Sequence, residues 1–170
     1  NHFGYSKVSL LGQSWGSMLA AMFYQKYPSK IHRMVFSGPF LSAPRFIQDC
    51  RLWLEELPQN IKDDINSAEE NHSYDSEKYL QAMDIFYRRH ICRTSEWPKT
   101  LNESFANMGL DVYLEMWGPS EFTCTGILQN IDLTEQLHNI NVPVLITNGE
   151  YDEVRIDTAE YYKSLIPQAQ

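Results

Sequence analysis

The sequence predicts an α/β fold in which parallel strands alternate with helices and a helical insertion interrupts the sheet. Three observations carry this prediction. A short apolar run over residues 8–11 is followed at once by a helical pattern, two further buried strands lie near residues 34–36 and 142–147, and residues 40–141 have almost no strand pattern. Strands that alternate with helices are typical of parallel sheets with helices on their faces.

Residues 1–39 contain the first strand, a tight turn and the first helix. Val8–Leu11 is aliphatic and partly β-branched, and from Trp15 the apolar residues fall at positions 15, 18, 19, 22 and 23, the spacing of one helix face. Pro28 ends this helix, and Met34–Phe36 forms a second strand that is closed by Ser37-Gly38-Pro39. Residues 1–39 are therefore predicted to belong to the sheet-containing core.

Residues 126–170 return to the core. Val142–Thr147 is the third strand, a turn over residues 148–152 follows, and Thr158–Leu165 closes as a helix with Asp157 or Thr158 as its N-cap. No strand is recognisable after this helix, and the first strand has a neighbour on one side only. Both edges of the sheet are therefore expected to be open, or to pair with a missing segment of the same protein or with a second copy.

Residues 40–125 are predicted to form a helical cap over the strand ends. Helical patterns cover Arg45–Leu57, Tyr79–Ile91 and Asp111–Trp117, and the segment is rich in aromatic residues. A structureless loop of this length would be contrary to what compact domains contain.

The composition fits a globular protein and excludes some partners. Hydrophobic residues make up 43% of the 170 residues, and 14 basic against 22 acidic residues give a net charge of −8. Such a surface repels nucleic acid and anionic lipid, and it suits a cationic ligand. The longest apolar run, Met18–Phe23, is too short to cross a membrane. Cys50, Cys92 and Cys124 fit neither a disulfide framework nor a zinc site, so a cytoplasmic location is expected.

The turn after the first strand carries a catalytic motif. Gly12-Gln13-Ser14-Trp15-Gly16 fits G-x-S-x-G, the nucleophile elbow, in which a serine between strand and helix takes a strained backbone and projects its hydroxyl above the sheet. The helix N-terminus that follows favours a developing oxyanion, and the Trp15 backbone N–H would be one donor to it. The alternative is an ordinary glycine turn. The flanking strand and helix favour Ser14 as the nucleophile.

The acid of a Ser–acid–His triad is expected at the end of a later strand. Asp152 lies just after the third strand, where the alternative is an aspartate that only stabilises a turn. The third member is missing, because every histidine precedes Asp152: His2, His32, His72, His90 and His138. None of these is assigned as the base.

Three segments together resemble the proline iminopeptidases, serine aminopeptidases of the α/β-hydrolase superfamily. They are Gly12–Ser17, Met116–Phe122 and Gly149–Glu153, and the similarity runs along nearly the whole chain. Ser17 stands where this family often has glycine. The resemblance implies a doubly wound, mostly parallel sheet with a helical cap, and release of an N-terminal proline or another apolar residue from short peptides. It implies no metal and no organic cofactor.

The resemblance also implies parts that these 170 residues do not contain. In that family an upstream His-Gly-Gly-type loop supplies half of the oxyanion hole, and a histidine follows the acid by a few tens of residues. The chain therefore looks like a C-terminal portion of the fold, and we expect it to be catalytically incomplete by itself.

Two glutamates match the family's acids that hold the free amino end of the substrate, Glu121 and Glu153. Paired carboxylates in a cleft would distinguish a charged terminus from an internal amide by charge-assisted hydrogen bonds. The alternative is that both are exposed acids of an acidic protein. Tyr113 and Trp117 would either wall a pocket for the pyrrolidine ring or belong to the cap core. We expect the two glutamates to converge near Ser14.

Two other functions stay open at this point. One is an esterase or other amide hydrolase of the same fold, which would be indifferent to a free amino end. The other is a non-catalytic binding module, which the missing histidine favours and the presence of Ser14 and Asp152 disfavours.

Overall fold

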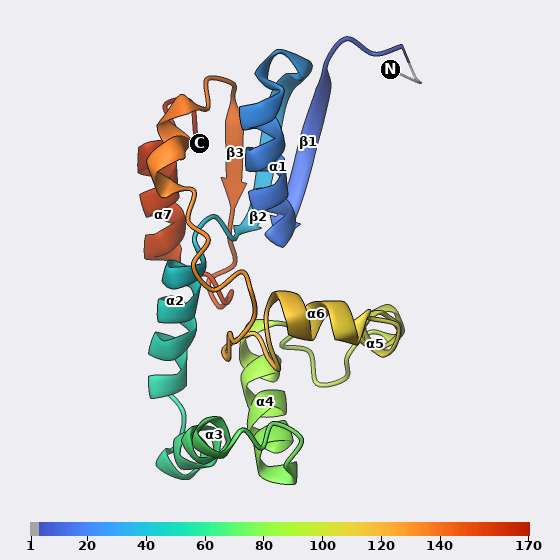
Figure 1. Ribbon diagram of the computed structural model, residues 1–170, viewed down its shortest axis with the longest axis vertical. Coiled ribbons are helices and arrows are strands. Elements are labelled where there is room, and N and C mark those ends of the chain that lie inside the picture. The colour runs from blue at the N-terminus through green and yellow to red at the C-terminus, as the bar shows by residue number, and fades with distance from the viewer. Residues whose placement is uncertain (1–3) are drawn as a thin grey trace. The chain divides into compact units, whose positions relative to one another are not determined.

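The computed structural model describes residues 4–170 and divides into two compact units (Figure 1). The first unit comprises Asn1–Phe46 and Asn130–Gln170, and the second comprises Ile47–Gln129. These limits lie a few residues from the boundaries expected at 39/40 and 125/126. The assignment of the units as hydrolase core and cap stays a prediction.

The first unit contains a parallel sheet of three strands in the order β1-β2-β3. The strands are β1 (Val8–Ser14), β2 (Ile31–Pro39) and β3 (Val144–Thr147). Ser14 pairs with Pro39, and Ser37 pairs with Thr147, so the carboxyl ends of all three strands lie at the same end of the sheet. The predicted parallel α/β sheet is confirmed, and the carboxyl end is where such sheets place their functional sites.

The helical elements of the first unit lie between or after its strands in the sequence. They are α1 (Trp15–Lys26), the 3-10 turns η1 (Pro28–Lys30) and η2 (Thr134–Asn139), and α7 (Ile156–Leu165). The N-cap predicted for α7 is wrong, because Arg155 is the N-cap and the helix begins two residues earlier than expected. Asp157 and Thr158 instead lie in its first turn, where Thr158 is buried.

The face of α1 that packs on the sheet differs from the apolar stripe read from the sequence. The buried residues are mostly small: Ser17, Met18, Ala20, Ala21 and Tyr24. Trp15, Leu19, Met22 and Phe23 are each between 41% and 51% exposed in the described part of the chain. Small side chains let the helix approach β1 and β2 closely, and close packing decides which face is buried.

The two edges of the sheet are not equivalent. Residues 168–170 run parallel to β3, with Gln170 N–H donating to Val144 O at 2.9 Å and Ile146 N–H donating to Gln170 O at 2.9 Å. The expectation of an open edge after α7 is therefore wrong. At the other edge, Val8 and Leu11 of β1 are 40% and 73% exposed.

The second unit is helical. It holds most of α2 (Ala43–Glu55), then α3 (Gln59–Asn71), α4 (Glu77–His90), α5 (Lys99–Ala106) and α6 (Leu110–Met116). The three predicted helices are confirmed as α2, α4 and α6, with ends shifted by one or two residues. Its core includes Tyr79, Phe86 and Phe122. The ring centroid of Phe122 lies 5.8 Å from that of Tyr79 and 5.0 Å from that of Phe86.

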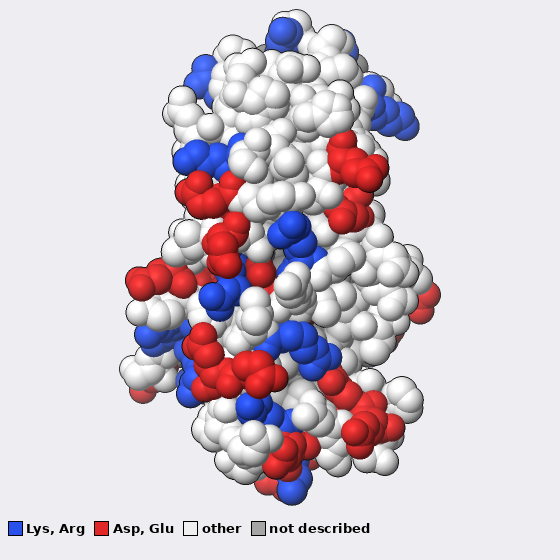
Figure 2. Space-filling view, turned by 90° about the vertical axis from the view of Figure 1, so that its left-hand side faces the viewer, with Lys and Arg blue, Asp and Glu red and all other residues white. Residues whose placement is uncertain are grey.

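Charged side chains of both signs are interspersed on the face shown in Figure 2. Ion pairs within the second unit include Arg51 with Glu69, Lys62 with Glu55 and Lys78 with Asp64. Among residues 4–170, no helix is both long and apolar enough to span a membrane.

Candidate active site

Ser14 lies at the junction of β1 and α1 in a conformation that few L-residues adopt. Its φ is 49° and its ψ is −123°. Left-handed φ at a non-glycine residue stores strain, and such strain clusters at functional sites. Although Ser14 is the N-cap of α1, its side chain makes no capping hydrogen bond. The turn therefore holds the serine without engaging its hydroxyl in capping.

The two glycines of the motif have different roles. A Cβ at Gly12 would lie 2.2 Å from the Gly16 carbonyl oxygen and 2.6 Å from the Ser17 nitrogen. The strand and the helix start therefore touch backbone to backbone, as the sequence predicts. At Gly16 itself, a Cβ would meet no described atom within 4 Å apart from its chain neighbours and the backbone of its own helix. Of the two glycines, only Gly12 is required by this packing.

Ser17 is a buried support of the elbow that sequence reasoning passed over. Its Oγ donates to the Ser14 carbonyl oxygen at 2.6 Å and accepts from the Phe40 N–H at 2.9 Å. The hydroxyl thus links the backbone of the elbow to the segment after β2. The one signal in the sequence was the departure from glycine at this position.

Asp152 lies at the same end of the sheet as Ser14, where the carboxyl ends of the strands lie. It follows β3 by five residues, and its Oδ2 would be only 3.0 Å from a Cβ at Gly38, the penultimate residue of β2. Gly38 has a φ of 51°, so glycine is favoured there both by the backbone and by the carboxylate. Sequence reasoning read Gly38 only as part of a turn.

The turn after β3 holds the carboxylate of Asp152 in place. The Val154 N–H donates to Asp152 Oδ1 at 3.0 Å, and Asn148 Nδ2 donates to the Val154 carbonyl at 2.7 Å. Burial raises the pKa of Asp152 above its ordinary value, while hydrogen bonds from backbone N–H groups of the turn lower it. Glu153, the next residue, is half-buried.

Glu121 lies in the second unit, on the loop between α6 and residue 130. Its carboxylate accepts a hydrogen bond from the Tyr113 hydroxyl at 2.8 Å. Burial raises the pKa of this carboxyl, and the Tyr113 hydrogen bond opposes the shift. Trp117 is buried and donates from Nε1 to the carbonyls of Ser120 and Glu121, so it belongs to the core of this unit. Because Glu121 and Glu153 belong to different units, their convergence stays a prediction.

The described histidines are either exposed or engaged in helix capping or aromatic packing. His32 and His138 are exposed, His72 is the left-handed C-cap of α3, and His90 packs against Phe86 at 4.6 Å between ring centroids. His2 lies outside the described residues. Their surroundings give no reason to assign any of these four as the base.

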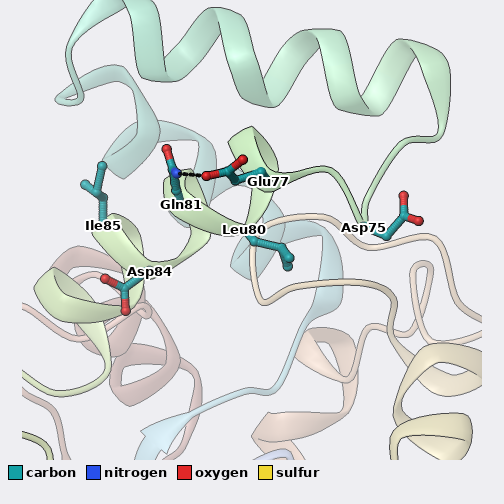
Figure 3. Close-up of a pocket in the computed structure, with 6 residues that line it drawn as sticks. All are labelled: Asp75, Glu77, Leu80, Gln81, Asp84 and Ile85. Carbon is teal, nitrogen blue, oxygen red and sulfur yellow. Dashed lines mark hydrogen bonds between the residues drawn. The ribbon is translucent and has the colours of Figure 1, made fainter.

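A cavity of about 700 Å³ lies along α4, and none of the predicted site residues is among the residues that line it (Figure 3). It is lined by Asp75, Glu77, Leu80, Gln81, Asp84 and Ile85, and Gln81 donates to Glu77 at 3.0 Å. In residues 4–170, no three His, Cys, Asp or Glu side chains are grouped so that they could hold a metal ion. The elbow and the Asp152 turn are therefore the candidate site.

Comparisons with known proteins agree with this geometry. A family model described as alpha/beta hydrolase fold matches residues 1–170. A proline iminopeptidase of Heyndrickxia coagulans is 41% identical over 164 residues, which are 96% of this chain and 57% of that protein. The proline iminopeptidase of Thermoplasma volcanium is 35% identical over 171 residues, 100% of this chain and 58% of that protein.

Two solved structures are similar over the whole length. The crystal structure of VinJ has a TM-score of 0.93 and 29% identity, and covers 100% of this chain and 58% of its own. The crystal structure of the proline iminopeptidase of Mycobacterium smegmatis has a TM-score of 0.87 and 30% identity, covering 99% and 57%. The resemblance stated from the sequence is confirmed, and the chain spans little more than half the length of the curated relatives named here.

Proposed function

The chain belongs to the α/β-hydrolase fold family, and on this premise we propose that the whole protein is a serine aminopeptidase. It releases N-terminal proline, or another apolar residue, from short peptides. The observation that carries the proposal is Ser14, which is held at a φ of 49° between a parallel strand and a helix, beside an aspartate turn at the same sheet edge. The names of the relatives described above support the substrate class.

In the proposed mechanism, the Ser14 hydroxyl attacks the carbonyl of the first residue of the peptide. A histidine accepts the hydroxyl proton and then gives it to the leaving amine, and Asp152 orients that histidine. The acyl-enzyme is hydrolysed by water through the same steps. The Trp15 N–H, at the N-terminus of α1, donates to the oxyanion. The chemistry requires no metal and no organic cofactor.

Glu121 and Glu153 are proposed to bind the positive charge of the substrate's amino end. The pKa of Glu121 is raised by burial, and a substrate ammonium beside it would favour the ionised form. Tyr113 donates its hydrogen bond to Oε1 of Glu121, so Oε2 is the oxygen proposed to contact the substrate ammonium. A carboxylate that is half-buried before the substrate arrives is suited to select a cation over a neutral acyl group.

We propose that the histidine, and a strand that pairs with β1, come from outside these 170 residues. The support for the strand is that apolar side chains of β1 and α1 are each at least 40% exposed: Val8, Leu11, Trp15, Leu19, Met22 and Phe23. The relatives are long enough to supply such a segment. Pairing with a second copy is the alternative, which the mass of the full-length protein in solution distinguishes. The three cysteines, whose number and spacing fit no disulfide framework, favour a cytoplasmic location.

The test is the release of aniline from L-proline anilide by the full-length protein, by its Ser14→Ala variant and by the 170-residue chain. We expect turnover by the full-length protein, loss of at least about a thousandfold in the variant, and very little turnover by the chain alone. N-acetylproline anilide is the control for the free amino end. Equal turnover of both anilides would favour an esterase or general amidase, and robust turnover by the 170-residue chain would place the base among its own histidines.

A further inference from the structure

The loop that carries Glu121 is fixed from inside the second unit by a chain of buried hydroxyl groups. Tyr79 Oη, on α4, lies 2.7 Å from Ser120 Oγ and 2.8 Å from Thr123 Oγ1. The exposed fractions of Tyr79 and Ser120 are 0%, and that of Thr123 is 4%. Tyr79 thus holds the residue before Glu121 and a residue two positions after it.

The direction of the protons along this chain follows from its end. Thr123 Oγ1 donates to Glu69 Oε1 at 2.8 Å, and that same oxygen accepts from Arg51 Nη2 at 2.7 Å. Tyr79 donates its single proton to Thr123 and therefore accepts from Ser120. The chain runs from Ser120 through Tyr79 and Thr123 to an ionised carboxylate, and a charged end strengthens the bonds before it.

The backbone of Glu121 is held at the same time. Its N–H donates to the Tyr87 hydroxyl at 3.2 Å, and its carbonyl accepts from Trp117 Nε1 at 3.2 Å. Phe122 packs against the Tyr79 ring with 5.8 Å between centroids. These contacts hold the backbone of the loop on both sides of Glu121. The position of the Glu121 carboxylate then depends only on the torsion angles of its own side chain.

We infer that Tyr79 is a positioning residue for Glu121, and that it sets how strongly the enzyme prefers a free amino end. The inference rests on the proposed function of Glu121. Tyr79 does not need to touch the substrate, because it acts through Ser120 and Thr123. The hydroxyl of Tyr79 is the only part of its side chain that this role requires beyond packing.

The test uses Tyr79→Phe in the full-length protein. We expect the KM for L-proline anilide to rise about tenfold with kcat changed by less than about twofold, because the lost hydroxyl loosens a binding group. Turnover of an ester without an amino group should be unchanged. The matched control is Tyr74→Phe: the Tyr74 ring lies 5.4 Å from that of Tyr79, but its hydroxyl contacts His72, outside the chain of hydroxyls. Tyr74→Phe should leave both substrates unchanged.

Glu121→Gln and the double variant separate this inference from the proposed function. If Glu121→Gln leaves the preference for the free amine intact, the role proposed for Glu121 is wrong, and this inference with it. If Glu121→Gln abolishes the preference but Tyr79→Phe does not weaken it, the role proposed for Glu121 is supported and the positioning role of Tyr79 is wrong. In the Glu121→Gln background, Tyr79→Phe should add less than about twofold to KM, because coupled residues are not additive.

A general loss of folded enzyme is distinguished from a positioning effect by comparing the turnover of the amine and ester substrates. Tyr79→Phe that lowers turnover of the amine and of the ester by the same factor would show that Tyr79 is only structural, and would overturn the inference. Thr123→Val, which keeps the shape but breaks the same chain, provides the second variant. It should reproduce the rise in KM that Tyr79→Phe gives, and a normal KM in Thr123→Val would also overturn the inference.

Discussion

The contact between Gly12 and Gly16 makes the sharpest prediction about the elbow. In Gly12→Ala the new Cβ lies 2.2 Å from the Gly16 carbonyl oxygen, and ordinary contact begins near 3.4 Å. The strand and the helix start must therefore separate by roughly 1 Å, because both contacting groups are backbone and neither can rotate away. Overpacking of this kind costs about 3 kcal/mol or more.

Two measurements follow from that displacement. For a domain of this size, about 3 kcal/mol lowers the melting temperature by roughly 6 to 12 °C. A shift of about 1 Å at the nucleophile costs roughly a hundredfold in kcat/KM. Differential scanning calorimetry and the L-proline anilide assay on the full-length protein measure the two effects.

Gly16→Ala is the matched control, because it adds the same methyl group to the other glycine of the motif. Apart from its chain neighbours and the backbone of its own helix, its Cβ meets no described atom within 4 Å, and alanine is the better helix former by about 1 kcal/mol. We expect an unchanged or slightly raised melting temperature. Equal losses in Gly12→Ala and Gly16→Ala, or none in either, would refute the packing argument.

Three further predictions concern the site. Ser14→Gly should abolish turnover and raise the stability of the fold by about 1 kcal/mol in denaturant titrations, because glycine adopts a φ of 49° without strain, whereas Ser14→Ala should abolish turnover with no such gain. Gly38→Ala should destabilise the fold by about 1 to 2 kcal/mol, because φ is 51° there and the Cβ would press on Asp152 Oδ2 at 3.0 Å; unchanged unfolding and kcat would contradict this. Glu121→Gln should stabilise the fold near pH 7, because burial raises the folded pKa of this carboxyl above its unfolded value and ionisation therefore costs stability as the pH rises. That gain should vanish below about pH 4.5, the unfolded pKa, and an equal gain in denaturant titrations at pH 4 and pH 7 would rule out this cause.

The sequence predicted the elements whose patterns are strong and local. The first strand, the turn at Ser14 and the helix after it were predicted because apolar runs and glycines mark them directly. The helix α3 was missed because its only buried residues are Ile65 and Ala68, too few for a visible stripe. The helix α5 is short and has no buried residue at all, so its sequence carries no long apolar stripe from which the helix could be predicted.

The parts of the site that escaped prediction are those that act by close approach. Ser17 and Gly38 each touch a segment distant in sequence, Phe40 in one case and Asp152 in the other. Composition and spacing report neither contact, since both depend on how the strands are aligned in the sheet. Tyr79 was noted only as an aromatic of a helix, and its bonds to Ser120 and Thr123 span more than 40 residues.

The helix α1 shows how a correct pattern led to an incomplete picture of packing. Its apolar residues occupy two faces, one with Ala20 and Ala21 against the sheet and one with Leu19 and Phe23 that is exposed in the described chain. A helix that is apolar on both sides is typical of an element buried on both sides. The strand β1 beside it has the same character, because Leu11 is 73% exposed at its free edge. The segment proposed to pair with β1 would lie beside the strand that carries Ser14, and we expect it to bury apolar side chains of β1 that are exposed among the described residues.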